Sequence, residues 1–245
     1  AWQDWLPETP DEVWASLHIY GAGSSSDTPH VYVTGVCAGD PSDLQPHLDA
    51  LQSASKARMT TRFVKETDFL ATMMIEGGCA DLSLAQCRPA AEGGTLGRES
   101  QIARSDFIAD PLPSSAIDVV LAAIEARRGQ KLFGGSVLFD AYGGAINRVG
   151  ATDTAFVHRD QLACLQYVAP LFNSAALAPS QAWIDGLYTA MRPYVSGYAY
   201  QNYIDPDLTD WQHAYYGVNL DRLIGVKTRY DPTNVFRFAQ GIPTR

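Results

Sequence analysis

The order of strands and helices along this chain is the feature that most restricts its fold. Runs rich in β-branched and aromatic residues occupy residues 13–20 and 30–37, and further runs occupy 137–142, 154–159 and 162–169. Short links join the strands within each group. Strands that follow one another closely pair antiparallel, whereas parallel pairs need long crossovers. We therefore expect an α+β fold in which helices cover one face of an antiparallel sheet.

Apolar residues at helical spacing predict the helices that would cover this sheet. Each run has a stripe of apolar residues at intervals of three and four. Met73 and Met74 lie in such a stripe, and we interpret them as core residues rather than as part of a cofactor site. Residues 88–104 are polar and glycine-rich, so we expect a loop there. The expected helices cover residues 41–56, 67–76, 114–128, 180–194, 211–216 and 219–230.

Residues 196–240 combine tyrosines, amides and carboxylates more densely than the rest of the chain. Tyr198, Tyr200 and Asn202 alternate along an extended run, which would place them on one face of a strand and Tyr203 on the other. Two aromatic rings and an amide make a poor apolar core. They make a suitable wall for a flat ligand that forms hydrogen bonds.

Composition excludes several classes of protein. The chain has 245 residues, of which 46% are hydrophobic and 18% charged, as expected of a globular protein with one large or two small domains. A net charge of −9 without clustered Lys and Arg argues against a nucleic-acid partner. No apolar run is long enough to predict a membrane span. The chain begins at Ala1 without methionine, which favours a processed chain or an excised piece.

The four cysteines allow a disulfide but no metal site. Cys79 and Cys87 lie in a glycine-rich loop and are either joined in a disulfide or buried as free thiols. Zinc needs more Cys or His at ligand spacing than this loop supplies, so we predict no metal. Cys37 and Cys164 lie in apolar, strand-like runs and are interpreted as small core residues.

The end of the chain resembles the C-terminal signature of the berberine bridge enzyme-like FAD-linked oxidases. The residues that carry this resemblance are 200–205 (YQNYID), 216–223 (YGVNLDRL), 230–236 (YDPTNVF), Lys227 and Gln240. Elements of the family's substrate domain match in the same order at 142–148 (YGGAINR), 154–159 (TAFVHR) and 165–167 (LQY). The resemblance covers nearly the whole chain.

This resemblance implies two parts. Residues 1–194 would form the substrate-binding domain, and residues 195–245 would form a strand-helix segment that returns to the FAD-binding domain. The family's N-terminal flavin domain, with its pyrophosphate loop and the residues that tether the flavin, has no counterpart here. FAD would therefore be bound mostly by a region absent from this chain, which a second chain carrying the flavin domain would supply.

The family oxidises C–H bonds next to oxygen or nitrogen, and the resemblance implies how residues here would take part. Tyr200 matches the base that removes the substrate's hydroxyl proton while a hydride passes to flavin N5. A tyrosine has an ordinary pKa of about 10, so it needs a hydrogen bond or a positive charge to act as a base. Tyr142 and Arg148 are the candidates to provide this support.

Other positions match the walls of the family's site. Asn202 and Tyr203 would lie beside the flavin ring. Gln166 would face the substrate, with Cys164 on the same face of its strand and Tyr198 nearby. Each position also has a simpler interpretation as ordinary packing or turn chemistry.

We therefore expect part of a secreted or extracytoplasmic FAD-dependent oxidase, with a small-molecule substrate. It would oxidise an alcohol or hemiacetal of a sugar or natural product, and oxygen would reoxidise the flavin and yield hydrogen peroxide. The alternative is a non-catalytic module that binds a glycan or aromatic ligand without flavin. The motifs of serine hydrolases, zinc proteases and phosphate-binding loops are absent from the sequence.

Overall fold

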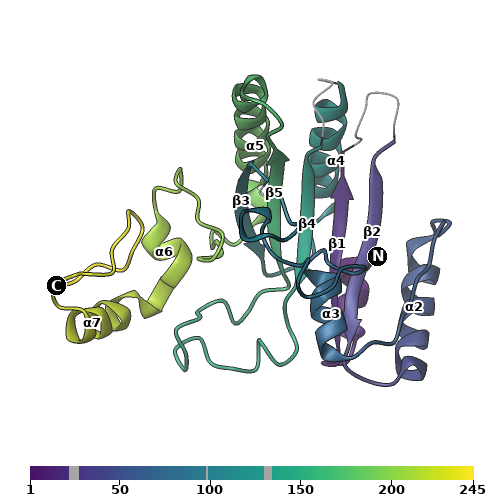
Figure 1. Cartoon of the computed structure of the whole chain (residues 1–245), viewed down its shortest axis with the longest axis horizontal. Coiled ribbons are helices and arrows are strands. Elements are labelled where there is room, and N and C mark those ends of the chain that lie inside the picture. Colours follow the sequence, from purple (N-terminus) through teal and green to yellow (C-terminus); the bar gives the residue numbers. More distant parts are fainter. Residues whose placement is uncertain (22–27, 98, 130–133) are drawn as a thin grey trace.

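The computed structural model describes residues 1–21, 28–97, 99–129 and 134–245. In this part of the chain one five-stranded antiparallel sheet has the order β2-β1-β4-β5-β3 (Figure 1). The expected antiparallel α+β fold is confirmed. The strands are β1 (Val13–Tyr20), β2 (His30–Cys37), β3 (Gln101–Ile108), β4 (Ser136–Ala141) and β5 (Ala163–Pro170).

The helices are close to those expected from periodicity. Short 3-10 turns cover Leu6–Glu8, Ala90–Glu92, Ser174–Ala176, Arg192–Tyr194 and Gly217–Asn219. The α-helices are α1 (Trp2–Trp5), α2 (Pro41–Ser55), α3 (Phe69–Glu76), α4 (Ser114–Gly129), α5 (Leu177–Met191), α6 (Trp211–Tyr216) and α7 (Leu220–Tyr230). No helix in the described ranges is both long and apolar enough to cross a membrane.

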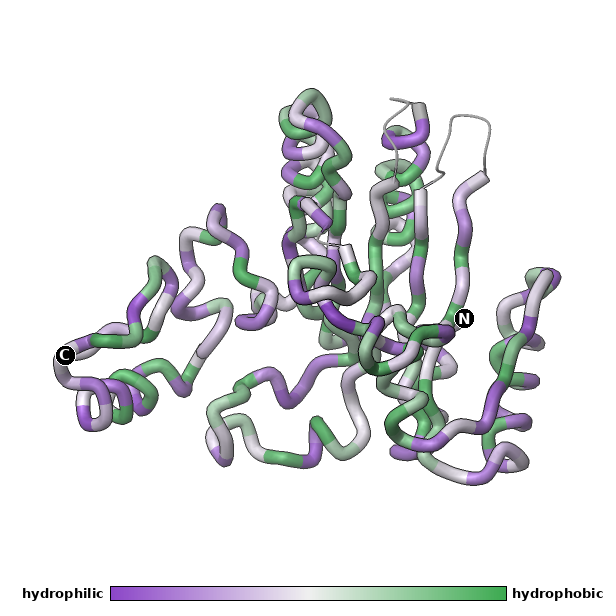
Figure 2. The backbone as a smooth tube through the Cα atoms, viewed as in Figure 1, coloured by the Kyte–Doolittle hydropathy of each residue, from purple (hydrophilic) through white to green (hydrophobic). Residues whose placement is uncertain are grey.

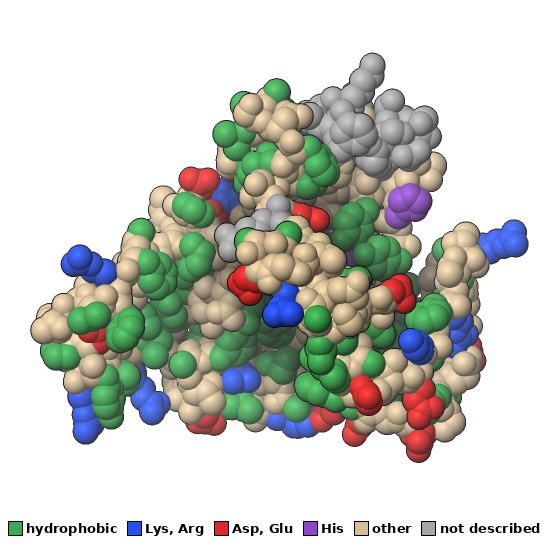
Figure 3. Space-filling view, in the orientation of Figure 1, with side chains coloured by type: hydrophobic (Ala, Val, Ile, Leu, Met, Phe, Trp, Pro, Cys, Tyr) green, Lys and Arg blue, Asp and Glu red, His purple; other side chains and the backbone are tan. Residues whose placement is uncertain are grey.

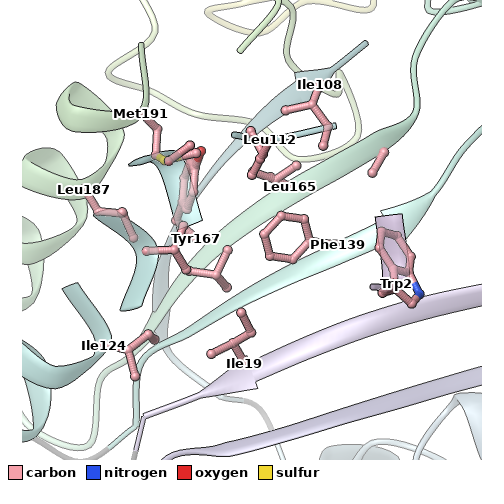
Figure 4. Packing of buried hydrophobic residues seen from close by; sticks show 14 of the residues in the cluster. Trp2, Ile19, Ile108, Leu112, Ile124, Phe139, Leu165, Tyr167, Leu187 and Met191 are labelled. Atoms are coloured by element: carbon pink, nitrogen blue, oxygen red, sulfur yellow. The ribbon is translucent and has the colours of Figure 1, made fainter. Parts of the chain in front are cut away.

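The main core lies on one face of the sheet. Alternate strand residues point into it, because successive side chains of a strand face opposite sides. Figure 4 shows Phe139, Leu165 and Tyr167 from the sheet packing with Ile124 of α4 and Leu187 of α5. Trp2 of α1 extends this core toward β1. The opposite face of the sheet, called here the open face, carries a different set of side chains.

Two expectations for strands are wrong. Residues 154–159 form turns and coil, and no strand forms over 198–203. In the second case the backbone N–H of Tyr203 donates to the carbonyl of Tyr200 at 2.9 Å, which closes a turn. This turn brings the ring of Tyr203 against that of Tyr200, so the two do not face opposite sides.

Two further expectations need correction. The strand β3 begins at Gln101, so residues 101–104 are strand rather than the end of the expected loop. The sequence pattern did not predict this strand, because Arg104 and Asp106 occupy core-side positions and interrupt the apolar alternation. The helix α3 buries none of its residues, and Met73 remains 43% exposed. Met73 is therefore not a core residue of the described structure.

The C-terminal part lies beyond β3, at one end of the sheet (Figure 1). It has its own small cluster around Ala199, Ala214 and Tyr215. Two backbone hydrogen bonds tie it to the edge of the sheet, from Phe107 to Tyr198 at 3.1 Å and from Ser196 to Phe107 at 2.8 Å. Figure 2 shows hydrophobic and hydrophilic residues alternating along α7, which buries none of its residues.

Candidate functional site

The open face carries a hydrogen-bonded network that crosses three strands. The Ser16 hydroxyl of β1 lies 2.9 Å from Asp140 Oδ1 of β4, to which it donates. Gln166 Nε2 of β5 donates to Asp140 Oδ2 at 3.1 Å and to the Tyr203 hydroxyl at 2.8 Å. The network therefore links the sheet to the turn that holds Tyr200, and it leaves the carbonyl oxygen of Gln166 available to a ligand.

His18 ends this network on the β1 side. Its Nε2 lies 2.9 Å from the Ser16 hydroxyl. Because that hydroxyl already donates its one proton to Asp140, Nε2 is the donor here, and the proton sits on Nε2. Burial lowers the pKa of His18, although the nearby Asp140 carboxylate acts in the opposite direction. The imidazole is therefore neutral near pH 7.

Tyr200 lies at the centre of an aromatic group next to this network. Asn202 Nδ2 donates to the Tyr200 hydroxyl at 2.8 Å, and the backbone N–H of Tyr200 donates to the Ser105 hydroxyl at 3.1 Å. The Tyr200 ring makes edge-to-face contacts with the rings of Tyr203, Phe156 and Phe107, whose centroids lie 4.9, 6.2 and 6.4 Å away. A hydrogen bond donated to a phenol oxygen stabilises its deprotonated form.

Tyr142 belongs to the same aromatic group, whereas Arg148 does not. The ring of Tyr142 meets Phe107 edge-on at 5.1 Å and stacks on Phe156 at 6.0 Å. Burial, followed by the nearby Cys164 thiol, raises the pKa of Tyr142 well above its ordinary value, so it stays protonated. Arg148 pairs with Asp11 at the surface. Of the two candidate supports for Tyr200, the structure places only Tyr142 close by.

Two residues that were expected to contact the substrate, Cys164 and Tyr198, do not line the site. Cys164 is 1% exposed, and burial together with the Asp140 carboxylate raises the pKa of its thiol. Tyr198 packs against His158 and His213, with ring centroids 5.2 and 5.5 Å away. It therefore lies at the junction between the sheet and the C-terminal part, whereas Gln166, Asn202, Tyr203 and Tyr200 form one group.

Sequence reasoning did not identify several members of this site. Asp140 and Ser16 are 124 residues apart in the chain, and only the pairing of β1 with β4 brings them together. His158 is buried and stacks on Phe107 at 4.3 Å, and burial lowers its pKa to about 4. His158 lies in the matched family element 154–159, but the sequence did not show that it stacks on Phe107.

A cleft of about 550 Å³ opens beside Gln166, Asn202 and Tyr203. Its size lies within the range of about 300–1,000 Å³ that is typical of small-molecule sites. Side-chain amides line much of it, from Gln101, Gln166, Gln181 and Asn202. Such a wall favours an uncharged ligand with many hydrogen-bonding groups.

Of the charged residues that line this cleft, Arg104 and Asp205 are paired, whereas Asp207 forms no ion pair among the described residues and accepts a hydrogen bond from Gln181 at 3.4 Å. Arg104 contacts Asp205 at 2.7 Å and Asp185 at 3.2 Å, and its guanidinium lies over the Tyr188 ring at 3.7 Å.

Lys227 pairs with Asp231 at the end of α7, as expected for a cation near a helix C-terminus. Within the described residues, no group of three or more His, Cys, Asp or Glu side chains could hold a metal ion.

The two cysteines of the glycine-rich loop, Cys79 and Cys87, are joined in a disulfide. This settles the choice that the sequence left open. Cys37 is partly exposed, whereas Cys164 is buried as expected.

Apolar side chains are exposed throughout the C-terminal part. Figure 3 shows hydrophobic side chains on the left of the view, over this part of the chain. We call these residues the C-terminal apolar surface, and each is at least 61% exposed: Val218, Tyr230, Val235, Phe236 and Phe238. Exposed apolar patches commonly mark sites where another protein surface docks.

Comparisons with known proteins identify the family. A family model described as "Berberine and berberine like" matches residues 199–243. The FAD-linked oxidoreductase YgaK of Bacillus subtilis is 30% identical over 242 residues, which cover 99% of this chain and 48% of YgaK. Berberine bridge enzyme-like C-1 of Nicotiana tabacum is 33% identical over 174 residues, which cover 57% of this chain and 30% of that protein.

Solved structures agree over the whole chain. Wild-type BBE-like 1 of Physcomitrella patens is 28% identical with a TM-score of 0.82, and the match covers 100% of this chain and 50% of that one. The chain thus spans about half the length of the relatives that it matches from end to end. On this combined evidence of sequence and fold, the chain belongs to the berberine bridge enzyme-like family of FAD-linked oxidoreductases.

Proposed function

We propose that this chain is the substrate-binding half of an FAD-dependent oxidase, together with the C-terminal segment of its flavin domain. Residues 1–194 bind the substrate, and residues 195–245 join the flavin half. The oxidase acts on an alcohol or hemiacetal of a sugar or natural product. The observation that carries this proposal is the hydrogen-bonded group of Tyr200, Asn202, Tyr203 and Gln166 beside an amide-lined cleft.

Tyr200 is the base in this proposal. To act as a base, Tyr200 must first be deprotonated, and the hydrogen bond from the Asn202 amide stabilises this form. The Tyr200 oxygen then accepts the proton of the substrate's hydroxyl. Tyr142 and Tyr203 stay protonated, because burial raises the pKa of each, so they serve as hydrogen-bond donors and ring walls. The free carbonyl of Gln166 accepts a second hydroxyl and orients the substrate.

The residues of the turn fit the ring of FAD. Asn202 is exposed, and Gln201 Oε1 is buried without a hydrogen-bond partner among the described residues, so an acceptor is ready for a ring N–H. When bound, FAD would supply the two-electron acceptor for the substrate's hydride, and its reoxidation by oxygen, with two protons, would give hydrogen peroxide. The pyrophosphate end of FAD would be held by the flavin half.

The amide-lined cleft supports the substrate class. Arg104 and Asp205 neutralise each other at the cleft, and Asp207 accepts a hydrogen bond from Gln181, so the cleft offers amide donors and acceptors together with one carboxylate. A polyhydroxylated or phenolic alcohol satisfies such a wall better than an acid does. The C-terminal apolar surface supports a further flavin half, because it leaves large apolar side chains exposed in the described structure.

The test is the colour and composition of the native protein. We expect flavin absorbance, and mass analysis should reveal the flavin half, either in a longer chain or in a second one. Adding alcohols of sugars and natural products should then release hydrogen peroxide. In this holoenzyme Tyr200→Phe should lower turnover by about 100-fold or more, as expected for a lost base, while substrate binding persists.

Tyr230→Phe is a matched control, because Tyr230 is 73% exposed on the C-terminal apolar surface rather than in the Tyr200 turn, and phenylalanine keeps an apolar ring there. Near-normal turnover in Tyr200→Phe would remove this tyrosine as the base. A colourless native protein that has no flavin half and releases no peroxide would contradict the oxidase, and would favour the non-catalytic binding module instead.

A further inference from the structure

One row of paired residues crosses the open face from the candidate site to the far strand of the sheet. Residues that pair directly in an antiparallel sheet point to the same face. We call this row the open-face strip. From β3 to β2, the register pairs Ser105 with Gln166, Gln166 with Leu138, Leu138 with His18, and His18 with Tyr32.

The far end of the strip is a packed aromatic group. The rings of His18 and Tyr32 stack with centroids 4.7 Å apart, and the Tyr20 ring stacks on both, at 5.8 and 5.7 Å. Burial, together with a hydrogen bond to Tyr20, raises the pKa of Tyr32 to about 12, so its hydroxyl stays protonated at neutral pH. Tyr32 is nevertheless 46% exposed. Its side chain is held by its neighbours and remains open to a ligand.

The strip offers neutral hydrogen-bonding groups. His18 is neutral near pH 7, because burial lowers its pKa. Its Nδ1 is buried without a hydrogen-bond partner among the described residues, so one acceptor on the strip remains to be satisfied. In the next row of the open face, the Asp140 carboxylate already accepts hydrogen bonds from Ser16 and Gln166. The strip therefore suits an uncharged ligand with hydroxyl groups.

The strip is longer than one small ring. Two strand spacings separate Gln166 from His18, and three separate it from Tyr32, which amounts to about 10 and about 14 Å. A single sugar ring bound at Gln166 ends short of the aromatic group, whereas two linked rings extend to it. Because Gln166 also lines the amide cleft, the strip continues that cleft across the sheet.

We infer that His18 and Tyr32 form a second subsite, which binds the second ring of a disaccharide. This inference rests on the proposed function, in which the first ring is oxidised beside Tyr200. The hydroxyl groups of a sugar match the neutral donors and acceptors of the strip, and its C–H groups pack on aromatic rings. A β-linked disaccharide is an extended chain, which matches a straight row across a sheet. Both residues determine specificity and touch no reacting atom.

The test is calorimetric titration of the native protein, flavin half included, with methyl β-cellobioside and methyl β-glucoside. Their blocked anomeric oxygens prevent oxidation at that carbon, so binding is measured without turnover there. We expect the two-ring ligand to bind about tenfold more tightly, and Tyr32→Ala to weaken its binding about tenfold while changing that of the one-ring ligand by less than about twofold. Val31→Ala is the matched control, because Val31 is 62% exposed and points to the opposite face of β2.

Circular dichroism checks that each variant folds, and Tyr32→Thr replaces Tyr32→Ala with a residue that favours strands. The inference is overturned if the native protein binds the two glycosides equally or binds neither. It is also overturned if the Tyr32 variants weaken both ligands alike or leave two-ring binding unchanged. Release of hydrogen peroxide from glucose and cellobiose tests the proposed function separately: without peroxide the oxidase is contradicted, even where the binding pattern supports the subsite.

Discussion

Asn202 donates its side-chain amide to the hydroxyl of Tyr200, two residues earlier in the same turn, at 2.8 Å. The turn exists because the Tyr203 N–H bonds to the Tyr200 carbonyl, and it is held to the sheet by Ser105 and Gln166. The donor and the proposed base therefore lie in one short turn, which two side chains of the sheet hold in place.

Replacing Asn202 with Asp is expected to slow the holoenzyme without abolishing it. The change substitutes an acceptor for the donor and puts a carboxylate next to the phenol oxygen. Loss of a hydrogen bond to a charged group costs about 1.5–3 kcal/mol, which corresponds to a fall in kcat of roughly 10- to 100-fold. Because the new carboxylate disfavours the deprotonated phenol, the increase of kcat with pH should occur at a higher pH than in the unsubstituted protein.

Steady-state kinetics across a pH series would measure this effect. Asn234→Asp is a suitable control, because Asn234 lies in a loop after α7, away from the Tyr200 turn. If Asn202→Asp changed KM alone and left kcat and its pH profile unaltered, Asn202 would have no role in supporting the base.

Asp205→Asn is expected to destabilise the chain strongly. Asp205 is 3% exposed and pairs with Arg104 at 2.7 Å. Its backbone N–H donates to the Tyr215 hydroxyl, and its carbonyl accepts a hydrogen bond from Gln240. Removing one partner of a buried ion pair leaves the other charge uncompensated and typically costs about 3–5 kcal/mol. Because Asp185 still contacts Arg104, we expect the lower end of that range.

Urea denaturation at pH 7 would measure this loss as a fall in the free energy of unfolding. Asp11→Asn is the matched control, since it breaks the exposed pair with Arg148 and should leave the unfolding curve nearly unchanged. If Asp205→Asn were as stable as the unsubstituted chain, the ion pair between Arg104 and Asp205 would not contribute to the free energy of unfolding.

The sequence predicted the parts of this fold that depend on local pattern. Alternating β-branched residues located β1 and β2 to the residue, because each has a simple apolar alternation. The same reasoning missed most of β3, since Arg104 and Asp106 sit on its core side and are neutralised by Asp185, Asp205 and Arg192, which come much later in the chain. Such compensation has no local signature.

The candidate site divides in the same way. Tyr200, Asn202 and Tyr203 are close in sequence, so the family signature could identify them together. Asp140 joins the site only through strand register, because β4 pairs with β1 on one side and with β5 on the other. Whether Tyr203 faced Tyr200 also depended on a turn that the pattern of alternation did not predict.

His158 is expected to make stability depend on pH between about 6.5 and 4. Burial lowers its pKa to about 4 in the folded chain, whereas an unfolded histidine titrates near pH 6.5. Between these values the unfolded state binds a proton that the folded state does not, so the folded state loses stability as pH falls. The full loss from this residue is on the order of 3 kcal/mol and is absent above about pH 7.

The variant His158→Phe isolates this contribution. Phenylalanine keeps a ring against Phe107, which His158 stacks on at 4.3 Å, but it cannot be protonated. The difference in free energy of unfolding between the two proteins should therefore shift by about 3 kcal/mol in favour of His158→Phe from pH 7 to pH 4. A difference that is constant across this range would mean that His158 has an ordinary pKa in the folded chain.

Phe236→Lys is expected to separate the stability of this chain from its assembly with the flavin half. Phe236 is 80% exposed, so the substitution should change the free energy of unfolding by less than about 0.5 kcal/mol, as usual for surface positions. A lysine at the centre of the C-terminal apolar surface should nevertheless lower the flavin content of the holoenzyme, because burying an unpaired charge in an interface is costly. Flavin absorbance relative to protein would measure this.

Phe63→Lys offers the same substitution at a residue that is 77% exposed but lies before α3, so it should leave the flavin content unchanged. Equal flavin loss in both variants would mean that the C-terminal apolar surface is not the specific site at which the flavin half docks.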